Sequence, residues 1–271
     1  MEKKFKLTDN YVLNEYGVKL YQIKCTNTFE YAKEGELGGY IEKEENLSQE
    51  DDAWVSGNAW VFDDARVSGN ALVYGTAQVS GDALVSGNAR VSGKALVYGT
   101  ARVSGNAWVF DDAHVSGDAL VYGTARVYDN ARVYGNAQVY GNARVSGNAQ
   151  VYGNALVFGN ARVYGNAWVS DDARVSGNAL VYGNARVYGD ACLKSDADHC
   201  GFDCFGSSNR HTHAYLTRDN TVEITCGCFR GSIEEFEKRV KNTHAGTVYE
   251  NQYNAIINVI KIKFGLDETS K

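Results

Sequence analysis

A six-residue period constrains the fold of this chain more than any other feature. From Ala53 to Val187 the pattern Ala-x-Val recurs in 23 consecutive hexads, and the last two positions are mostly Gly followed by Asn, Asp or Thr. The period is not helical, because Val at every sixth position would spiral around a helix of 3.6 residues per turn. In an extended chain, Val points to one side and its neighbours point to the other. Each hexad is therefore predicted to form one short strand with Val inward, followed by a corner in which Gly and Asn tolerate positive φ.

Strands this short bury their Val only by stacking, so the stable unit is the whole run. The sequence predicts an all-β parallel β-solenoid over residues 53–198, with a cap at residues 1–52 that includes a strand at 19–25. Residues 199–271 lack the period and predict a small α+β domain. Its elements are two strands around a turn at 219–220, a helix opened by the capping box 232–235, and a second helix from about 249 to 264.

The residue between Ala and Val alternates along the run. It is polar in eleven of the twelve odd hexads and apolar in nine of the eleven even hexads, where the exceptions are Arg132 and Arg144. Two architectures fit. A three-sided coil, with three hexads in each coil, would alternate Arg with Leu or Trp up each face and allow cation–π contacts. A flat, two-sided turn, with two hexads in each turn, would place every Leu and Trp on one face, which would then require a partner. The pattern leaves both open.

The hexad Val-Ser-Gly-Asn-Ala-Arg resembles the hexapeptide repeat of left-handed parallel β-helix proteins, and the resemblance implies three sides and left-handed coiling. Residues 35–55 are similar to the entry segment of bacterial and phage repeat proteins described as polymer-forming or acyltransferase-like. The Cys-Gly-Cys-Phe-Arg-Gly stretch at 226–231, followed by a helix, resembles a phage-type C-terminal module. The acyltransferase resemblance implies an acyl-CoA substrate and a His base. His114, alone among the repeats, is the candidate.

Two clusters after the repeats contain the side chains suited to chemistry. Cys and His side chains of residues 199–228 have spacings compatible with a zinc site, although none forms a tight C-x2-C pair. The zinc candidates are Cys200, Cys204, Cys226 and Cys228. The second cluster is polar, and its Gly, Ser and Asn residues favour an anion-binding loop. The ligand-binding candidates are Ser207, Ser208, Asn209, Arg210, His211 and His213.

The charge and apolar content of the chain exclude some classes of binding partner. The repeats carry 10 basic and 10 acidic side chains with no basic stripe, which argues against a nucleic-acid groove. No apolar run or signal-like segment is visible, so we expect a cytoplasmic protein with free cysteines and no membrane contact.

We therefore expect a non-catalytic, phage-related scaffold that forms homo-oligomers through its aromatic surface. Its C-terminal domain is expected to bind a protein partner or ligand, and no cofactor is expected unless the cysteines hold zinc. The alternatives are an acyltransferase, or a phage inhibitor that binds a host protein or sequesters a nucleotide signal.

Overall fold

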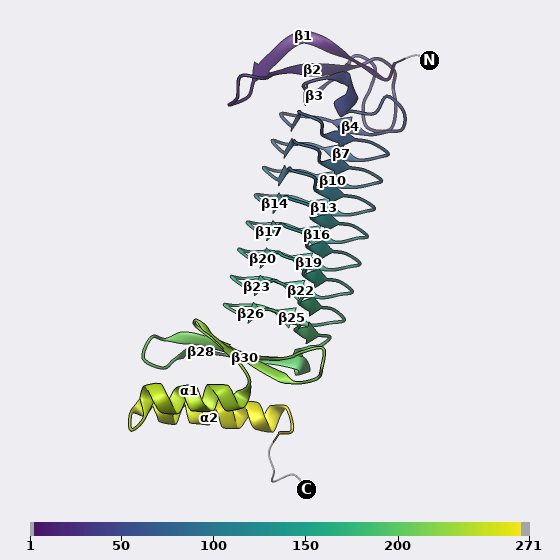
Figure 1. The fold of residues 1–271 in the computed structure, drawn as a ribbon. Helices are drawn as coiled ribbons and strands as arrows, with labels where there is room; N and C mark the ends of the chain where they lie inside the picture. The colour runs from purple at the N-terminus through teal and green to yellow at the C-terminus, as the bar shows by residue number, and fades with distance from the viewer. Residues whose placement is uncertain (1–2, 267–271) are drawn as a thin grey trace.

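A computed structural model describes residues 3–266. The repeats form a long stack of coils, and a small domain of sheet and helices covers its C-terminal end (Figure 1). Every strand of the stack before the last coil pairs in parallel with the strand three hexads later, as Val91 pairs with Val109. The parallel β-solenoid is confirmed, and its coil has three sides of one hexad each. The two-sided alternative is wrong, because it would pair strands that are two hexads apart.

The three faces are named here in chain order. Face I consists of β4 (Trp54–Val55), β7 (Leu72–Val73), β10 (Arg90–Val91), β13 (Trp108–Val109), β16 (Arg126–Val127), β19 (Arg144–Val145), β22 (Arg162–Val163) and β25 (Leu180–Val181). Face II consists of β5 (Trp60–Val61), β8 (Gln78–Val79), β11 (Leu96–Val97), β14 (His114–Val115), β17 (Arg132–Val133), β20 (Gln150–Val151), β23 (Trp168–Val169) and β26 (Arg186–Val187). Face III consists of β6 (Arg66–Val67), β9 (Leu84–Val85), β12 (Arg102–Val103), β15 (Leu120–Val121), β18 (Gln138–Val139), β21 (Leu156–Val157), β24 (Arg174–Val175) and β27 (Cys192–Leu193).

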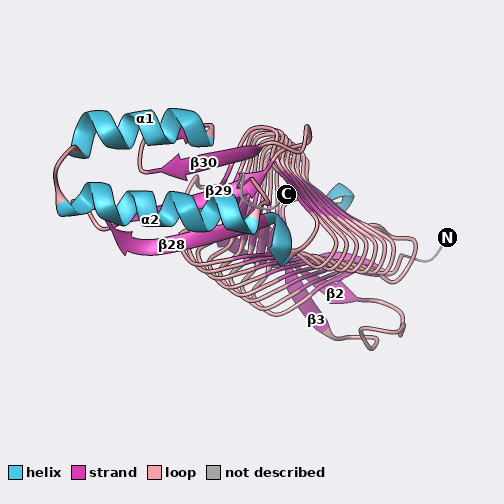
Figure 2. Cartoon of the chain, turned by 90° about the horizontal axis from the view of Figure 1, so that it is seen from below, coloured by secondary structure: helices cyan, strands magenta, loops and turns pink. Residues whose placement is uncertain are grey.

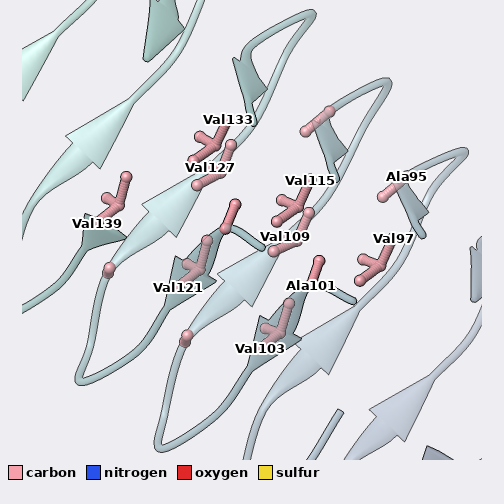
Figure 3. Packing of buried hydrophobic residues seen from close by; sticks show 14 of the residues in the cluster. Ala95, Val97, Ala101, Val103, Val109, Val115, Val121, Val127, Val133 and Val139 are labelled. Carbon is pink, nitrogen blue, oxygen red and sulfur yellow. The ribbon is translucent and has the colours of Figure 1, made fainter. Parts of the chain in front are cut away.

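Val and Ala fill the interior, as predicted. The Val side chains of all three faces point into the coil and, together with the Ala of each hexad, are essentially inaccessible to solvent (Figure 3). Because each Val lies above the Val of the preceding coil, one continuous apolar core runs through the repeats. The stacking also places Arg next to aromatic rings, as in Arg90 and Arg126, whose guanidinium carbons lie 5.2 and 5.1 Å from the centre of the Trp108 ring.

Close approach between coils explains the glycine at each corner. Gly69 has a φ of +66°, and a Cβ added there would lie 2.9 Å from the backbone nitrogen of Gly87 in the next coil. A few corners replace Gly by Asp at positive φ. In three of them, Asp63, Asp129 and Asp171, the carboxylate accepts a hydrogen bond from a backbone N–H of the next coil. Corner chemistry therefore holds neighbouring coils together as well as turning the chain.

The N-terminal segment closes the first coil. β1 (Phe5–Leu13), β2 (Lys19–Cys25) and β3 (Leu37–Ile41) form an antiparallel meander, and β3 then pairs in parallel with β5, extending face II. The strand expected at 19–25 is confirmed as β2. A short helix, η1 (Glu44–Asn46), leads into the repeats. The buried Lys4 ammonium donates to three backbone carbonyls at the start of the stack, including that of Ala53 at 2.9 Å. These contacts satisfy carbonyls that have no preceding coil.

The C-terminal domain is α+β, as expected. After η2 (Asp196–Asp198), an antiparallel sheet is formed by β28 (His199–Phe205), β29 (Arg210–Leu216), β30 (Val222–Cys226) and β31 (Phe229–Gly231). Two helices, α1 (Ile233–His244) and α2 (Val248–Lys263), cover the outer face of this sheet, and its inner face lies against the last coil (Figures 1 and 2). The capping box at the start of α1 is present. Within residues 3–266, no helix combines the length and apolar character needed to cross a membrane.

Candidate functional site at the junction

Alternation along β29 distributes its side chains between two environments. Tyr215 packs into the apolar core of the repeats, whereas Ala214 packs with the helices on the other side of the sheet. His211 and His213 have the same parity as Tyr215 and therefore lie on the side of the last coil. The predicted H-x-H pair thus lies at the boundary between the solenoid and the C-terminal domain.

His213 is the fully buried centre of this boundary. Its Nδ1 lies 3.1 Å from the backbone carbonyl oxygen of Arg186, and its Nε2 lies 3.0 Å from Nδ1 of His199. Because a carbonyl only accepts, His213 donates from Nδ1 and accepts from His199 at Nε2. Burial lowers the pKa of His213 to about 3, and burial also lowers the pKa of His199. Both rings are therefore neutral at pH 7, and they fix β28 and β29 against β26.

His211 has a different partner. Its Nδ1 lies 2.6 Å from a carboxylate oxygen of Asp203, which is half exposed, while the His211 ring is largely buried. The carboxylate orients the ring, as neighbouring carboxylates do for functional imidazoles. The Nε2 of His211 is buried and has no hydrogen-bond partner within the described residues. An oriented imidazole with one unused nitrogen is a common part of binding and catalytic sites.

A hollow of about 460 Å³ opens on one side of His211. Its walls come from the last coil and from the C-terminal sheet, and the lining residues are Asn184, Arg186, Arg210, His211, Thr225, Gly227 and Cys228. Arg186 extends over the ring of Trp168, with 4.8 Å between the guanidinium carbon and the ring centre. Neither arginine of this hollow has an acidic partner within ion-pair distance in the described part of the chain. Two uncompensated guanidinium groups give the hollow a positive potential.

Asn184 adds an amide donor to the same hollow. It is the last rung of a ladder in which Asn148 donates to Asn166, and Asn166 donates to the Oδ1 of Asn184 across 3.3 Å. No further rung follows in the described part of the chain, so the amide nitrogen of Asn184 makes no rung-to-rung bond. The hollow therefore combines two guanidinium groups with neutral hydrogen-bond donors, and this set suits an anion that carries several oxygens.

A second hollow of about 350 Å³ lies on the other side of His211. Its lining residues are Tyr182, Gly183, Ala185, Asp196, His199, Cys200, Gly201, Asp203, His211 and His213. The two hollows share only His211, which stands between them. All the histidines on the inner face of the sheet therefore contact one or both hollows.

The structure separates the predicted ligand-binding loop into two parts. Arg210, His211 and His213 lie at the junction described above. Ser207, Ser208 and Asn209 form the exposed turn between β28 and β29 and contribute nothing to the lining of either hollow. The turn is anchored from outside, where Gln252 of α2 accepts a hydrogen bond from the backbone of Gly206.

The four zinc candidates do not assemble. Cys226 is buried beside the hydroxyl groups of Thr212 and Tyr253, whereas Cys228 is exposed, because Gly227 at a φ of +60° ends the strand between them. Cys204 is exposed, and Cys200 lies half-buried. Across residues 3–266, no three His, Cys, Asp or Glu side chains are placed so that they could hold a metal ion.

His114 lies in the middle of face II, in register with Leu96 and Arg132. Burial, together with the charge of Arg132, lowers its pKa. No loop leaves the coil beside it, since the hexads before and after it are uninterrupted. The charged side chains that act on the His114 ring are those of Arg132 and Asp112.

Sequence reasoning missed Arg186, Asn184 and Asp203. Arg186 looks like any other Arg of an odd hexad, and only its position in the last coil distinguishes it. Asp203 lies on the same side of its strand as His199, because the two are separated by an even number of residues. The pairing of β28 with β29 then brings Asp203 next to His211, and no local sequence pattern predicts that pairing.

Comparisons with known proteins agree with the repeat architecture. A family described as the YdcK β-solenoid repeat matches the chain at residues 77–93, 85–99, 125–138, 137–151, 149–165, 157–171, 161–177 and 173–189. No curated protein matches the chain. The family matches lie within the repeats and leave the acyltransferase resemblance and the phage-type C-terminal module untested. The chain is therefore a β-solenoid repeat protein, similar in its repeats to the YdcK description.

Proposed function

We propose that this protein is a non-catalytic scaffold that binds a small, multiply charged anion at the junction between its solenoid and its C-terminal domain. The observation that carries the proposal is the pairing of Arg186, from the last coil, with Arg210, from β29, around one hollow that supplies no acidic partner for either. Guanidinium groups that have no acidic partner bind phosphate or carboxylate through paired, charge-assisted hydrogen bonds.

The location of the site links binding to assembly of the two parts. A ligand held by both arginines would bridge the solenoid and the C-terminal sheet, because each arginine belongs to a different part. Binding energy would then add to the contacts that already hold the junction, such as the 3.5 Å ion pair between Arg230 and Asp171. The rigid stack serves as the holder, and the C-terminal domain supplies residues that the repeats do not contain.

The test is calorimetric titration of the full chain with pyrophosphate and with ADP, using glycerol as the uncharged comparison. Arg210→Gln is expected to weaken pyrophosphate binding at least tenfold, the usual loss when a charged hydrogen-bond donor is removed. Lys241→Gln, which removes one positive charge from the exposed side of α1, is the matched control and should leave binding unchanged. Equal affinity in the wild type and in Arg210→Gln would overturn the proposal.

Tighter binding of ADP than of pyrophosphate would favour a nucleotide ligand. That result would support the alternative in which a phage inhibitor sequesters a nucleotide signal. We also propose that the protein forms homo-oligomers, binds a protein partner and works in a reducing, cytoplasmic location. All six cysteines are free, which is compatible with such a location. The acyltransferase alternative predicts turnover of an acyl-CoA that is lost in His114→Ala.

A further inference from the structure

A ladder of arginines distinguishes face I from the other two faces. Arg126, Arg144 and Arg162 occupy successive strands, β16, β19 and β22, and they pair in register (Figure 1). On faces II and III, every arginine of the repeats is separated from the next by at least one uncharged or His rung. The ladder exists because Arg144 stands in an even hexad, where the repeat normally places Leu or Trp.

The three positive charges on neighbouring strands repel one another, because adjacent strands lie about 4.8 Å apart. All three side chains are exposed, and none forms an ion pair within the described residues. Arg126 alone has an aromatic partner, Trp108. The arrangement costs free energy in the isolated chain, and a bound anion would remove that cost.

Acidic side chains are segregated away from one edge of this ladder. The ten aspartates of the repeats all lie at the corner between faces I and II or at the corner between faces II and III. The corner between faces III and I carries only Gly, Asn and Thr in its fifth and sixth hexad positions. Asp129, the nearest aspartate along the chain, lies at the opposite edge of face I, where its carboxylate accepts from the backbone N–H of Gly147.

The ladder and the uncharged corner form a groove of about 560 Å³. The lining residues are Thr124, Arg126, Asn142, Arg144, Asn160, Arg162, Asn178 and Leu180. Along the corner, Asn142 donates to Asn160 and Asn160 donates to Asn178, each across 3.1 Å. An amide has two N–H groups, so each asparagine that donates one bond to the next rung retains a second donor. The groove therefore has cations along one wall and amide donors and acceptors along the other.

We propose that this groove binds a linear anionic polysaccharide with a carboxylate on each sugar. The rungs repeat at about 4.8 Å along a straight, rigid axis, a spacing similar to the length of one pyranose ring in an extended chain. The carboxylates on the side of the polymer that faces the ladder would then pair with its arginines. Sugar hydroxyl groups both donate and accept, and so does the asparagine wall, which makes the two walls complementary to the two kinds of group on such a polymer.

Nucleic acid and polyphosphate fit this groove less well. A single-stranded nucleic acid is usually bound by aromatic side chains on which its bases stack, and no aromatic residue lines the groove. Polyphosphate has no hydroxyl groups to donate to the asparagine oxygens. Both polymers therefore serve as competing outcomes of the test. The inference is independent of the junction site, since none of its residues lines the groove.

The test is titration of the full chain with polygalacturonate and with size-defined oligogalacturonates. Arg144→Leu restores the residue type typical of an even hexad, so it is expected to keep the fold and to reduce affinity about tenfold. Arg102→Leu is the matched control: it makes the same change in β12 of face III, between Leu84 and Leu120, and should change affinity less than twofold. Affinity should rise with oligomer length up to three or four sugars and weaken with added salt.

Several outcomes would overturn the inference. These are equal losses in Arg144→Leu and Arg102→Leu, absence of polygalacturonate binding, or tighter binding of single-stranded DNA or polyphosphate at equal charge. Arg210→Gln separates the two proposals, because it should weaken pyrophosphate binding at the junction at least tenfold and leave polygalacturonate binding intact. Circular dichroism of each variant verifies that the stack remains folded.

Discussion

The repeats and the C-terminal domain share a boundary at β26, but they use their residues in opposite ways. In the repeats, each Val, Ala and Gly performs the same task in coil after coil, so stability is a sum of nearly identical neighbour contacts. In the C-terminal domain, His213, Asp203 and Tyr215 each have one partner set that occurs once. The comparison teaches that repeated identical contacts make the stack rigid. Side chains with contacts found only once are concentrated in the domain that follows the repeats.

The most severe test of the repeat side is a charge in its core. Val109→Asp would bury an unpaired carboxylate between Val91 and Val127, in a core that offers no hydrogen-bond donor. We expect a loss of at least about 4 kcal/mol of unfolding free energy, or failure to fold. Thermal and urea melts followed by circular dichroism measure it. Gln138→Asp, on the outer side of face III, is the control and should melt almost as the wild type does.

Acid should weaken the C-terminal domain before it weakens the stack. The pKa of His213 is about 3 in the folded chain and near its ordinary value of 6.5 when unfolded. Between these values the unfolded chain binds a proton that the folded chain does not, so stability falls as pH drops from 6.5 toward 3. At pH 5 the loss is about 2 kcal/mol.

Hydrogen exchange, corrected for its intrinsic pH dependence, should show protection lost in residues 199–231 and kept in 101–139. His213→Asn, which keeps a donor toward the Arg186 carbonyl, should flatten the pH dependence. A uniform loss along the whole chain would contradict the assignment to His213.

The contribution of coil-to-coil contact is measured by two corner glycines. Gly69 and Gly183 both have φ near +65°, but a Cβ at Gly69 would meet the next coil, whereas one at Gly183 would meet nothing within 4 Å. Both Ala variants incur the cost of positive φ. Gly69→Ala should be the less stable of the two by about 1–3 kcal/mol, the usual range for overpacking. Equal melting of the two variants would mean that corner strain, not contact between coils, selects glycine.

The smallest effect is expected at His114. His114→Ala replaces one outward side chain in the middle of face II and should change the unfolding free energy by less than about 0.5 kcal/mol. Melting curves and pyrophosphate titration together would check this expectation. A large loss of either stability or binding would assign His114 a role that its neighbours on face II do not indicate.

Local pattern predicted the elements of this fold well, because the information for each lies within a few residues. The inward Val, the corner glycine and the capping box at Ser232 are of this kind. The strands β28 and β31 were not predicted, since β28 mixes polar and apolar residues and β31 has only three residues. The resemblance to hexapeptide repeats favoured three sides, but the repeat pattern alone could not exclude two sides, because alternation with a period of two hexads competes with pairing between strands three hexads apart.

The candidate sites were harder to predict for a physical reason. Arg126, Arg144 and Arg162 become neighbours only when the coil length is known, and the equal numbers of acidic and basic residues in the repeats hide their separation onto different edges. The junction forms only when the C-terminal sheet packs against the last coil, so no sequence pattern links Arg186 with Arg210. Of the predicted polar cluster, Arg210, His211 and His213 reach the junction, and the serines do not.

Pairing between strands three hexads apart also makes the solenoid a spacer with a fixed phase. Insertion or loss of three hexads would lengthen or shorten the distance between the two ends while returning every later residue to its original face. A change of one hexad would instead rotate everything that follows by one face, a third of a turn. Relatives that differ in length by whole coils should therefore present the arginine groove and the junction at the same relative azimuth, whereas a single-hexad change would point them in different directions.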